Sequence, residues 1–180
     1  MILDKDIQEV LISTEQLRQR VAEMARQITE DYAGRTPIVI GILRGSFIFM
    51  ADLVRQLDLP VVLDFMSASS YGAQTMSSGL VDIRLDLSED IAGRDVIVIE
   101  DILDTGNTLS KIIKELEGRK PASIAICTLL DKPERRKKDI KADYVGFTIP
   151  DAFVVGYGLD YDQRYRHLPY IGVLKPKVYE

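Results

Sequence analysis

The sequence is short of cysteine, histidine and long apolar runs, and each shortage narrows what the protein can be. Its one cysteine, Cys127, cannot form an internal disulfide, and the surrounding run SIAICTLL favours a buried small hydrophobic residue. Its one histidine, His167, argues against a zinc site, which usually draws on several His and Cys ligands. No apolar run approaches the ~20 residues that cross a bilayer, and the start MILDKDIQEVL lacks the pattern of a signal peptide. We therefore expect a protein of the reducing cytoplasm with no membrane partner.

An excess of basic charge and several well-known loops are also absent. The formal net charge is −5, which argues against a binder of duplex nucleic acid. The chain has no GxGxxG after its first predicted strand, no GxxxxGK[ST] and no GxSxG. These absences exclude the dinucleotide fingerprint, the Walker-type phosphate loop and the strained serine turn of the α/β-hydrolases.

What is present fits one globular domain, residues 1–180, with 46% hydrophobic and 28% charged residues. Strand-like apolar runs alternate with segments of helical periodicity. We expect strands at residues 38–43, 60–65, 81–87, 96–99, 122–130, 144–147 and 153–157, and helices at residues 13–32, at 47–57 and after the turn at 104–108. This alternation predicts an α/β fold in which a mostly parallel central sheet has helices on both faces.

The most informative stretch is DVIVIEDILDTGNTLS, residues 95–110. Residues 96–99 are apolar and β-branched, as in a strand buried on both faces, and Glu100 and Asp101 follow at once. Asp104 then opens the turn DTGNT, which leads into a helix. A loop of this kind offers N–H groups and hydroxyls to a phosphate. Carboxylates repel phosphate, so these acids are expected to bind sugar hydroxyls or a metal.

Two further strand ends are expected at the same edge of the sheet, where open α/β sheets bind ligands. They carry Arg44-Gly45 and Lys132. Simpler interpretations exist: a solvated Arg44 turn, solvated acids, and a DTGNT turn that merely caps its helix. A phosphorylated sugar accounts for the acids and the loop together. The basic run at residues 134–138 is expected to be a solvated turn.

Residues 67–79, SASSYGAQTMSSG, carry no charge and are rich in Ser, Gly and Ala. A segment of this length inside a compact domain is more often a functional loop than a linker. We expect a flexible loop at about residues 67–80 that closes over the site.

These residues together resemble a known family. VIVIEDILDTGNT resembles the phosphoribosyl-pyrophosphate signature of the type I phosphoribosyltransferases, and Leu43-Arg44-Gly45 is similar to that family's pyrophosphate loop. Ser70-Tyr71 lies in a segment similar to its flexible catalytic hood loop. LLDKPERR and VGFTIPDAFVVGYGLDYDQRYRHLPYIG resemble the 6-oxopurine branch, the hypoxanthine-guanine phosphoribosyltransferases. The resemblance covers nearly the whole chain from residue 38 onward, and it implies that family's fold.

The resemblance implies a role for each matching residue. On the donor side, Glu100 and Asp101 hold the ribose hydroxyls, and Arg166 with the Arg44-Gly45 turn receives pyrophosphate. The 5′-phosphate loop consists of Asp104, Thr105, Gly106, Asn107 and Thr108. Some members of the family carry lysine at the position of Asn107, and the effect of this departure on donor affinity is left open. In that family the peptide bond at the Arg44 position tends to be cis.

On the acceptor side, the resemblance implies that Lys132 contacts the 6-oxygen, that Phe153 stacks on the base, and that Val154 meets the base edge through its backbone. Asp104 is the implied general base for the proton at N7. A Mg²⁺ cofactor is implied, with Asp160 as a ligand beside Glu100 and Asp101. A lysine can only donate, so it suits a carbonyl oxygen and opposes the amino group of adenine.

The function implied is purine salvage: transfer of a phosphoribosyl group from phosphoribosyl pyrophosphate to hypoxanthine or guanine. Two alternatives stay open. One is an enzyme that prefers xanthine or another base, and the other is a regulator that keeps the sugar-phosphate site but binds nucleic acid. The family tends to form dimers and tetramers, so a homo-dimer or homo-tetramer is expected.

Overall fold

The structure, a computed structural model, describes residues 5–69 and 82–179. Its centre is a six-stranded sheet in the order β4-β3-β2-β5-β6-β7, and all neighbouring strands are parallel except β3 and β4. The strands are β2 (Ile38–Leu43), β3 (Val62–Ser69), β4 (Asp82–Leu85), β5 (Asp95–Leu103), β6 (Ser123–Asp131) and β7 (Tyr144–Thr148). The mostly parallel sheet expected from the sequence is confirmed.

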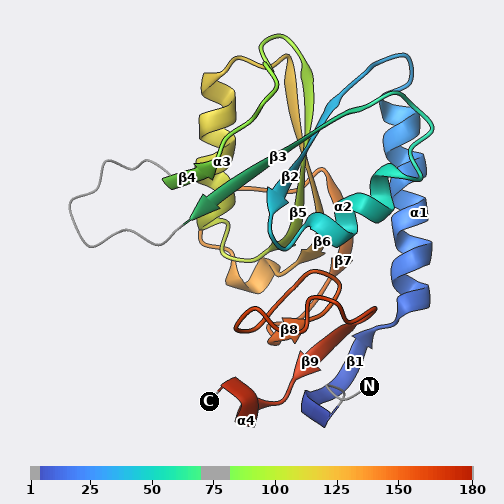
Figure 1. The fold of residues 1–180 in the computed structure, drawn as a ribbon, viewed down its shortest axis with the longest axis vertical. Helices are drawn as coiled ribbons and strands as arrows, with labels where there is room; N and C mark the ends of the chain where they lie inside the picture. The colour runs from blue at the N-terminus through green and yellow to red at the C-terminus, as the bar shows by residue number, and fades with distance from the viewer. Residues whose placement is uncertain (1–4, 70–81, 180) are drawn as a thin grey trace.

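Helices cover both faces of this sheet (Figure 1). On one face lie α1 (Thr14–Asp31) and α2 (Phe47–Val54), and on the other lies α3 (Asn107–Gly118). The start of α1 is fixed by a capping box: Ser13 Oγ accepts from the Gln16 N–H at 3.2 Å, and Gln16 Oε1 accepts from the Ser13 N–H at 2.8 Å. Among the residues that the structure describes, no helix is both long and apolar enough to cross a membrane.

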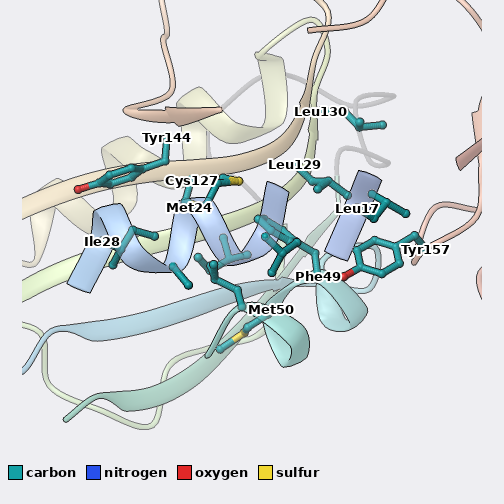
Figure 2. Close-up of a cluster of buried hydrophobic side chains, with 14 of the residues drawn as sticks. Leu17, Met24, Ile28, Phe49, Met50, Cys127, Leu129, Leu130, Tyr144 and Tyr157 are labelled. Atoms are coloured by element: carbon teal, nitrogen blue, oxygen red, sulfur yellow. The ribbon is translucent and has the colours of Figure 1, made fainter. Parts of the chain in front are cut away.

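The core has one layer on each side of the sheet. In β5, Ile97 and Ile99 pack toward α1 and α2, while Val96 and Val98 pack toward α3. This division explains why the strand is an unbroken apolar run. Figure 2 shows the layer beneath α1 and α2, where Cys127 lies among large apolar side chains. Burial raises the pKa of the Cys127 thiol, as expected for a small hydrophobic residue of the core.

A second, three-stranded sheet was not predicted. It is antiparallel, with the order β1-β9-β8, and consists of β1 (Ile7–Ile12), β9 (Ile171–Leu174) and β8 (Val154–Val155). The short helix α4 (Pro176–Tyr179) follows β9. Figure 1 shows this small sheet beyond the carboxyl ends of the parallel strands of the large sheet. It therefore stands next to the edge at which a ligand site was expected.

Several predicted boundaries were wrong. β5 continues to Leu103, so Glu100 and Asp101 lie within the strand rather than after it, because Glu100 still pairs with Thr128 of β6. β3 runs to Ser69 and takes up the first residues of the loop expected at 67–80. The strand expected at 153–157 shrinks to two residues, since Gly156 and Gly158 adopt positive φ angles of 102° and 107°. The rest of the expected loop, residues 70–80, lies outside the described residues.

Candidate active site

A cavity of about 500 Å³ opens at the carboxyl ends of β2 and β5. It brings together four segments: the turn after β2, the end of β3 at Ala68, the end of β5 with the start of α3, and the chain after β8. Eleven of the predicted site residues line it: Arg44, Gly45, Glu100, Asp101, Asp104, Thr105, Gly106, Asn107, Thr108, Asp160 and Arg166. The expected convergence is therefore present for the strand ends at Arg44-Gly45 and at residues 100–108, but not for Lys132.

The turn before α3 depends on a glycine. Gly106 has φ +76° and a Cβ added there would lie 2.6 Å from a methyl carbon of Ile140, so both conformation and space require glycine. No side chain caps α3, and its first N–H, that of Asn107, donates to Thr105 Oγ1 at a long 3.3 Å. The remaining N–H groups of the first turn have no partner within the helix, and they face a cavity suited to an anion.

Arg136 holds this turn from behind. Its Nε donates to the carbonyl oxygen of Asp104 at 3.0 Å, and its Nη2 donates to that of Leu103 at 3.2 Å. The same guanidinium pairs with the Asp131 carboxylate at the end of β6. The expectation that residues 134–138 form a solvated turn was wrong for Arg136, whose partly buried side chain joins β5 to β6. Nothing in the run ERRKK distinguishes Arg136 from its neighbours, so the sequence carried no signal for this role.

The carboxylates of Glu100 and Asp101 lie half-buried side by side. Burial, together with the neighbouring Asp101 charge, raises the pKa of Glu100 well above its usual range. Burial also raises the pKa of Asp101, although the nearby Arg166 opposes this shift. Asp101 Oδ1 accepts from the Ile102 N–H at 2.8 Å. Two crowded carboxylates of this kind favour a ligand that donates hydrogen bonds or carries positive charge.

Two arginines, Arg44 and Arg166, also line the cavity. The peptide bond between Leu43 and Arg44 is cis, as the resemblance implied. Gln163 Oε1 accepts from Arg44 Nη1 at 3.0 Å and from Arg166 Nη2 at 3.2 Å, so one amide links both guanidinium groups. Arg166 also pairs with Asp160 at 2.8 Å. Gln163 was not singled out from the sequence, because an exposed glutamine in a loop gives no signal before its partners are known.

Three predicted residues, Lys132, Phe153 and Val154, do not line this cavity. These residues form a group of their own. The buried Lys132 donates from Nζ to the carbonyl oxygen of Ala152 at 2.6 Å, and Ala152 is followed directly by Phe153 and by Val154, the first residue of β8. Val154 is buried in the small sheet. The Phe153 ring is 39% exposed. Predicted Ser70 and Tyr71 lie outside the described residues.

Asp104 lines the cavity and is also connected, through Arg135, to Asp151 near Phe153. Its Oδ1 lies 3.0 Å from Arg135 Nε, and Arg135 Nη1 lies 3.3 Å from Asp151. The Arg135 N–H is not aimed at the oxygen, so Oδ1 of Asp104 is buried without a hydrogen bond to any described residue. Such an oxygen is a ready acceptor for a ligand proton.

Comparison with known proteins fits this geometry. Residues 11–162 match the family model described as "Phosphoribosyl transferase domain". Because this match spans most of the chain, the protein belongs to the phosphoribosyltransferases, and the predicted family is confirmed.

The relatives narrow the family further. The chain is 54% identical to the hypoxanthine-guanine phosphoribosyltransferase of Bacillus subtilis over 179 residues, 99% of either chain. It is 56% identical to the hypoxanthine phosphoribosyltransferase of Salmonella typhimurium over 166 residues, 91% of this chain and 93% of the other. A crystal structure of a hypoxanthine phosphoribosyltransferase from Staphylococcus aureus matches with a TM-score of 0.95 at 50% identity, covering 100% of this chain and 98% of that one. Within the phosphoribosyltransferases, the chain belongs to the hypoxanthine-guanine phosphoribosyltransferase family.

Proposed function

We propose that this protein transfers the 5-phosphoribosyl group of phosphoribosyl pyrophosphate to N9 of hypoxanthine or guanine, giving IMP or GMP and pyrophosphate. The observation that carries the proposal is the single cavity in which two crowded carboxylates, an uncapped helix start and two arginines face one another. Each of these groups suits one part of the donor. The named relatives support the acceptor.

The donor occupies the cavity in this proposal. Its 5′-phosphate accepts from N–H groups and hydroxyls of residues 104–108, where the dipole of α3 adds to the attraction. The ribose hydroxyls donate to Glu100 and Asp101, whose pKa values are raised chiefly by burial, so that hydrogen-bond donors from the ligand would stabilise their charge. Arg44 and Arg166, already linked through Gln163, receive the pyrophosphate and stabilise its charge as it leaves.

The acceptor base lies beside the cavity. Lys132 would turn from the carbonyl oxygen of Ala152 to donate to the 6-oxygen, Phe153 would stack on the purine ring, and the backbone of Val154 would meet its edge. Asp104 then accepts the N7 proton as N9 attacks the ribose carbon, which is general-base catalysis. Its Oδ1 has no hydrogen bond to a described residue, although Arg135 Nε lies 3.0 Å away, so Arg135 has to shift when the base binds.

Mg²⁺ is the proposed cofactor. The residues fit it: carboxylate oxygens are its preferred ligands, and Glu100, Asp101 and Asp160 line one cavity. Among the described residues, no three Asp, Glu, His or Cys side chains lie in an arrangement that could hold a metal ion by themselves. The proposal therefore requires substrate phosphates to supply further ligands, as is usual for Mg²⁺. When bound, the ion neutralises charge on the leaving pyrophosphate.

For the assembly we propose a homo-dimer or homo-tetramer of this one-domain chain in the cytoplasm. An apolar patch beside α2 supports self-association, and its members are all more than a third exposed: Phe47 (44%), Leu63 (45%), Phe65 (38%) and Leu85 (45%). Leu63 and Phe65 alternate along β3 and so share a face, and Leu85 on β4 pairs opposite Ser67 on that face. A second copy presents the same patch and can cover it.

The test is an absorbance assay with phosphoribosyl pyrophosphate, Mg²⁺ and one of hypoxanthine, guanine, xanthine or adenine. We expect turnover with hypoxanthine or guanine and little with adenine. A clear preference for xanthine would favour the enzyme alternative. No turnover with any 6-oxopurine, combined with salt-dependent binding of RNA or DNA, would favour the regulator and contradict the proposal.

A further inference from the structure

Three aromatic rings meet where α4 returns to β8. The rings of Phe153 and Tyr179 are stacked, with centroids 4.7 Å apart and planes 18° from parallel. Tyr161 meets Phe153 edge-on at 5.6 Å, with planes 85° apart. Tyr161 and Tyr179 are also in T-shaped contact, at 6.5 Å. Phe153, the proposed base-stacking residue, is therefore itself held by two tyrosines. We call these residues the aromatic trio.

The trio leaves one face of Phe153 open. If Tyr161 and Tyr179 covered opposite faces of the Phe153 ring, their centroids would be separated by close to the sum of their two distances from it. Their actual separation of 6.5 Å is far shorter, so the two tyrosines do not lie on opposite faces of the Phe153 ring. Phe153 accordingly keeps 39% of its surface exposed although it is stacked and met edge-on.

The stack joins the base side of the site to the end of the chain. Figure 1 shows α4, the helix that contains Tyr179, farther from the large sheet than β8. The residue before Phe153 is tied to the large sheet, since the Ala152 carbonyl accepts from Lys132 Nζ at 2.6 Å. Tyr179 covers one face of the Phe153 ring, and neither tyrosine stacks on the other face.

We propose that Tyr179 is a positioning residue for the purine acceptor. By stacking on one face of Phe153 it fixes the plane of that ring before the base arrives, so that less side-chain freedom is lost on binding. This inference rests on the proposed function, and it extends the acceptor site to a helix that does not touch the substrate.

A positioning role of this kind predicts a specific kinetic pattern. The stack on Phe153 contributes equally whether the bound base is a substrate or part of the transition state, so losing it raises KM for the base and leaves kcat nearly unchanged. Replacing Tyr179 by leucine should raise KM for hypoxanthine about 3- to 10-fold, the range expected for an aromatic pair. KM for phosphoribosyl pyrophosphate should stay the same, since the donor cavity lies elsewhere.

The experiment compares Tyr179→Leu, Tyr179→Phe and Lys177→Ala with the wild-type protein in the presence of Mg²⁺. Tyr179→Phe keeps the aromatic ring, so its KM for hypoxanthine should equal that of the wild type. Lys177→Ala changes an exposed residue of the same helix and should have no effect. Thermal unfolding of each variant, expected within about 2 °C of the wild type because α4 is peripheral, separates a local effect from loss of the fold.

An unchanged or lowered KM for hypoxanthine in Tyr179→Leu would overturn the inference, and a lowered KM would show that Tyr179 covers the base site instead of supporting it. A proportional rise in both substrates' KM values would also overturn it. These outcomes presuppose turnover by the wild-type protein. Absence of that turnover contradicts the proposed function itself, and the inference with it.

Discussion

A Cβ atom added to Gly45 would lie 1.5 Å from Oδ2 of Asp101. The carboxylate therefore occupies the space in which any other residue at position 45 would place its side chain. The turn after β2 and the acidic end of β5 fit together only because one of them has no side chain. Gly158 extends the same packing, since its added Cβ would lie 2.0 Å from the Gly45 carbonyl oxygen.

Gly45→Ala should therefore lower activity by at least about 10²-fold, because a displacement of about 1 Å in a catalytic arrangement has an effect of that size. The Asp101 carboxylate or the Arg44 turn must move, and both belong to the proposed donor site. KM for phosphoribosyl pyrophosphate should rise with the loss. Steady-state kinetics with each substrate varied in turn measures both effects.

Gly118→Ala is the matched control. A Cβ at this last residue of α3 meets nothing within 4 Å, and its φ is not positive. Alanine should leave kinetics unchanged and raise stability slightly. Equal loss of activity in both variants would show that the contact between Gly45 and Asp101 does not matter.

Glu100→Gln should stabilise the protein at neutral pH while it lowers activity. A carboxyl group whose pKa is raised in the folded state binds protons more tightly there than in the unfolded chain, so its ionisation costs stability as pH rises. That cost is absent below the ordinary Glu pKa of ~4.3 and is complete above the raised value. We expect a gain of about 1 kcal/mol at pH 8, or about 2–4 °C in Tm.

This gain should shrink as the pH falls toward 4. Thermal unfolding across that range measures it, and the exposed Glu117→Gln variant provides the comparison. A Tm gain that does not vary with pH, or no gain at all, would contradict the raised pKa of Glu100 that burial and the Asp101 charge produce.

Asp104→Asn should lower kcat by about 10²- to 10⁴-fold, the usual contribution of a general base. The amide keeps the size of the carboxylate but cannot accept a proton, so KM for phosphoribosyl pyrophosphate should change little. The exposed Asp162→Asn variant is the control. Comparable losses in turnover and donor binding would mean that Asp104 only shapes the loop.

Leu63→Glu should shift the protein toward monomers, because it places a charge in the apolar patch beside α2. Sedimentation velocity over a range of concentrations measures the shift. Val10→Glu, at an exposed apolar residue of β1, is the control and should leave the assembly unchanged. An unaltered sedimentation coefficient in Leu63→Glu would remove this patch from the interface.

The large sheet could be predicted from the sequence because most of its strands can be recognised from their own residues alone. Residues 38–43 and 96–99 are apolar without interruption, and only a strand buried on both faces needs that pattern. The small sheet could not be predicted in the same way. β1 has the burial pattern of a half-exposed strand, with only Ile7 and Ile12 buried, and its partner β9 is 159 residues or more away along the chain. Neither strand is identifiable before its partner is known.

The site shows a similar division. Arg44, the acids of β5 and the residues of the phosphate loop could be predicted because each marks a strand end. Arg136 and Gln163 could not, since their importance comes from carbonyl and guanidinium partners that only the folded chain brings close. The division of the predicted residues into a donor group and an acceptor group around Lys132 was implied by the family resemblance, and the cavity lined only by the donor group agrees with it.

The pairing of β1 with β9 has a consequence for the order in which the protein assembles. A contact that closes a loop of this length costs more chain entropy, so it is expected to form late in folding. β2, β5 and β6 can associate through much shorter loops. The acids of β5 and the 5′-phosphate loop belong to the early elements, whereas Asp160, Arg166 and the small sheet next to Phe153 come from the last part of the chain. This topology predicts that the 5′-phosphate side of the site forms first and that the arginine side and the base side are completed together at the end.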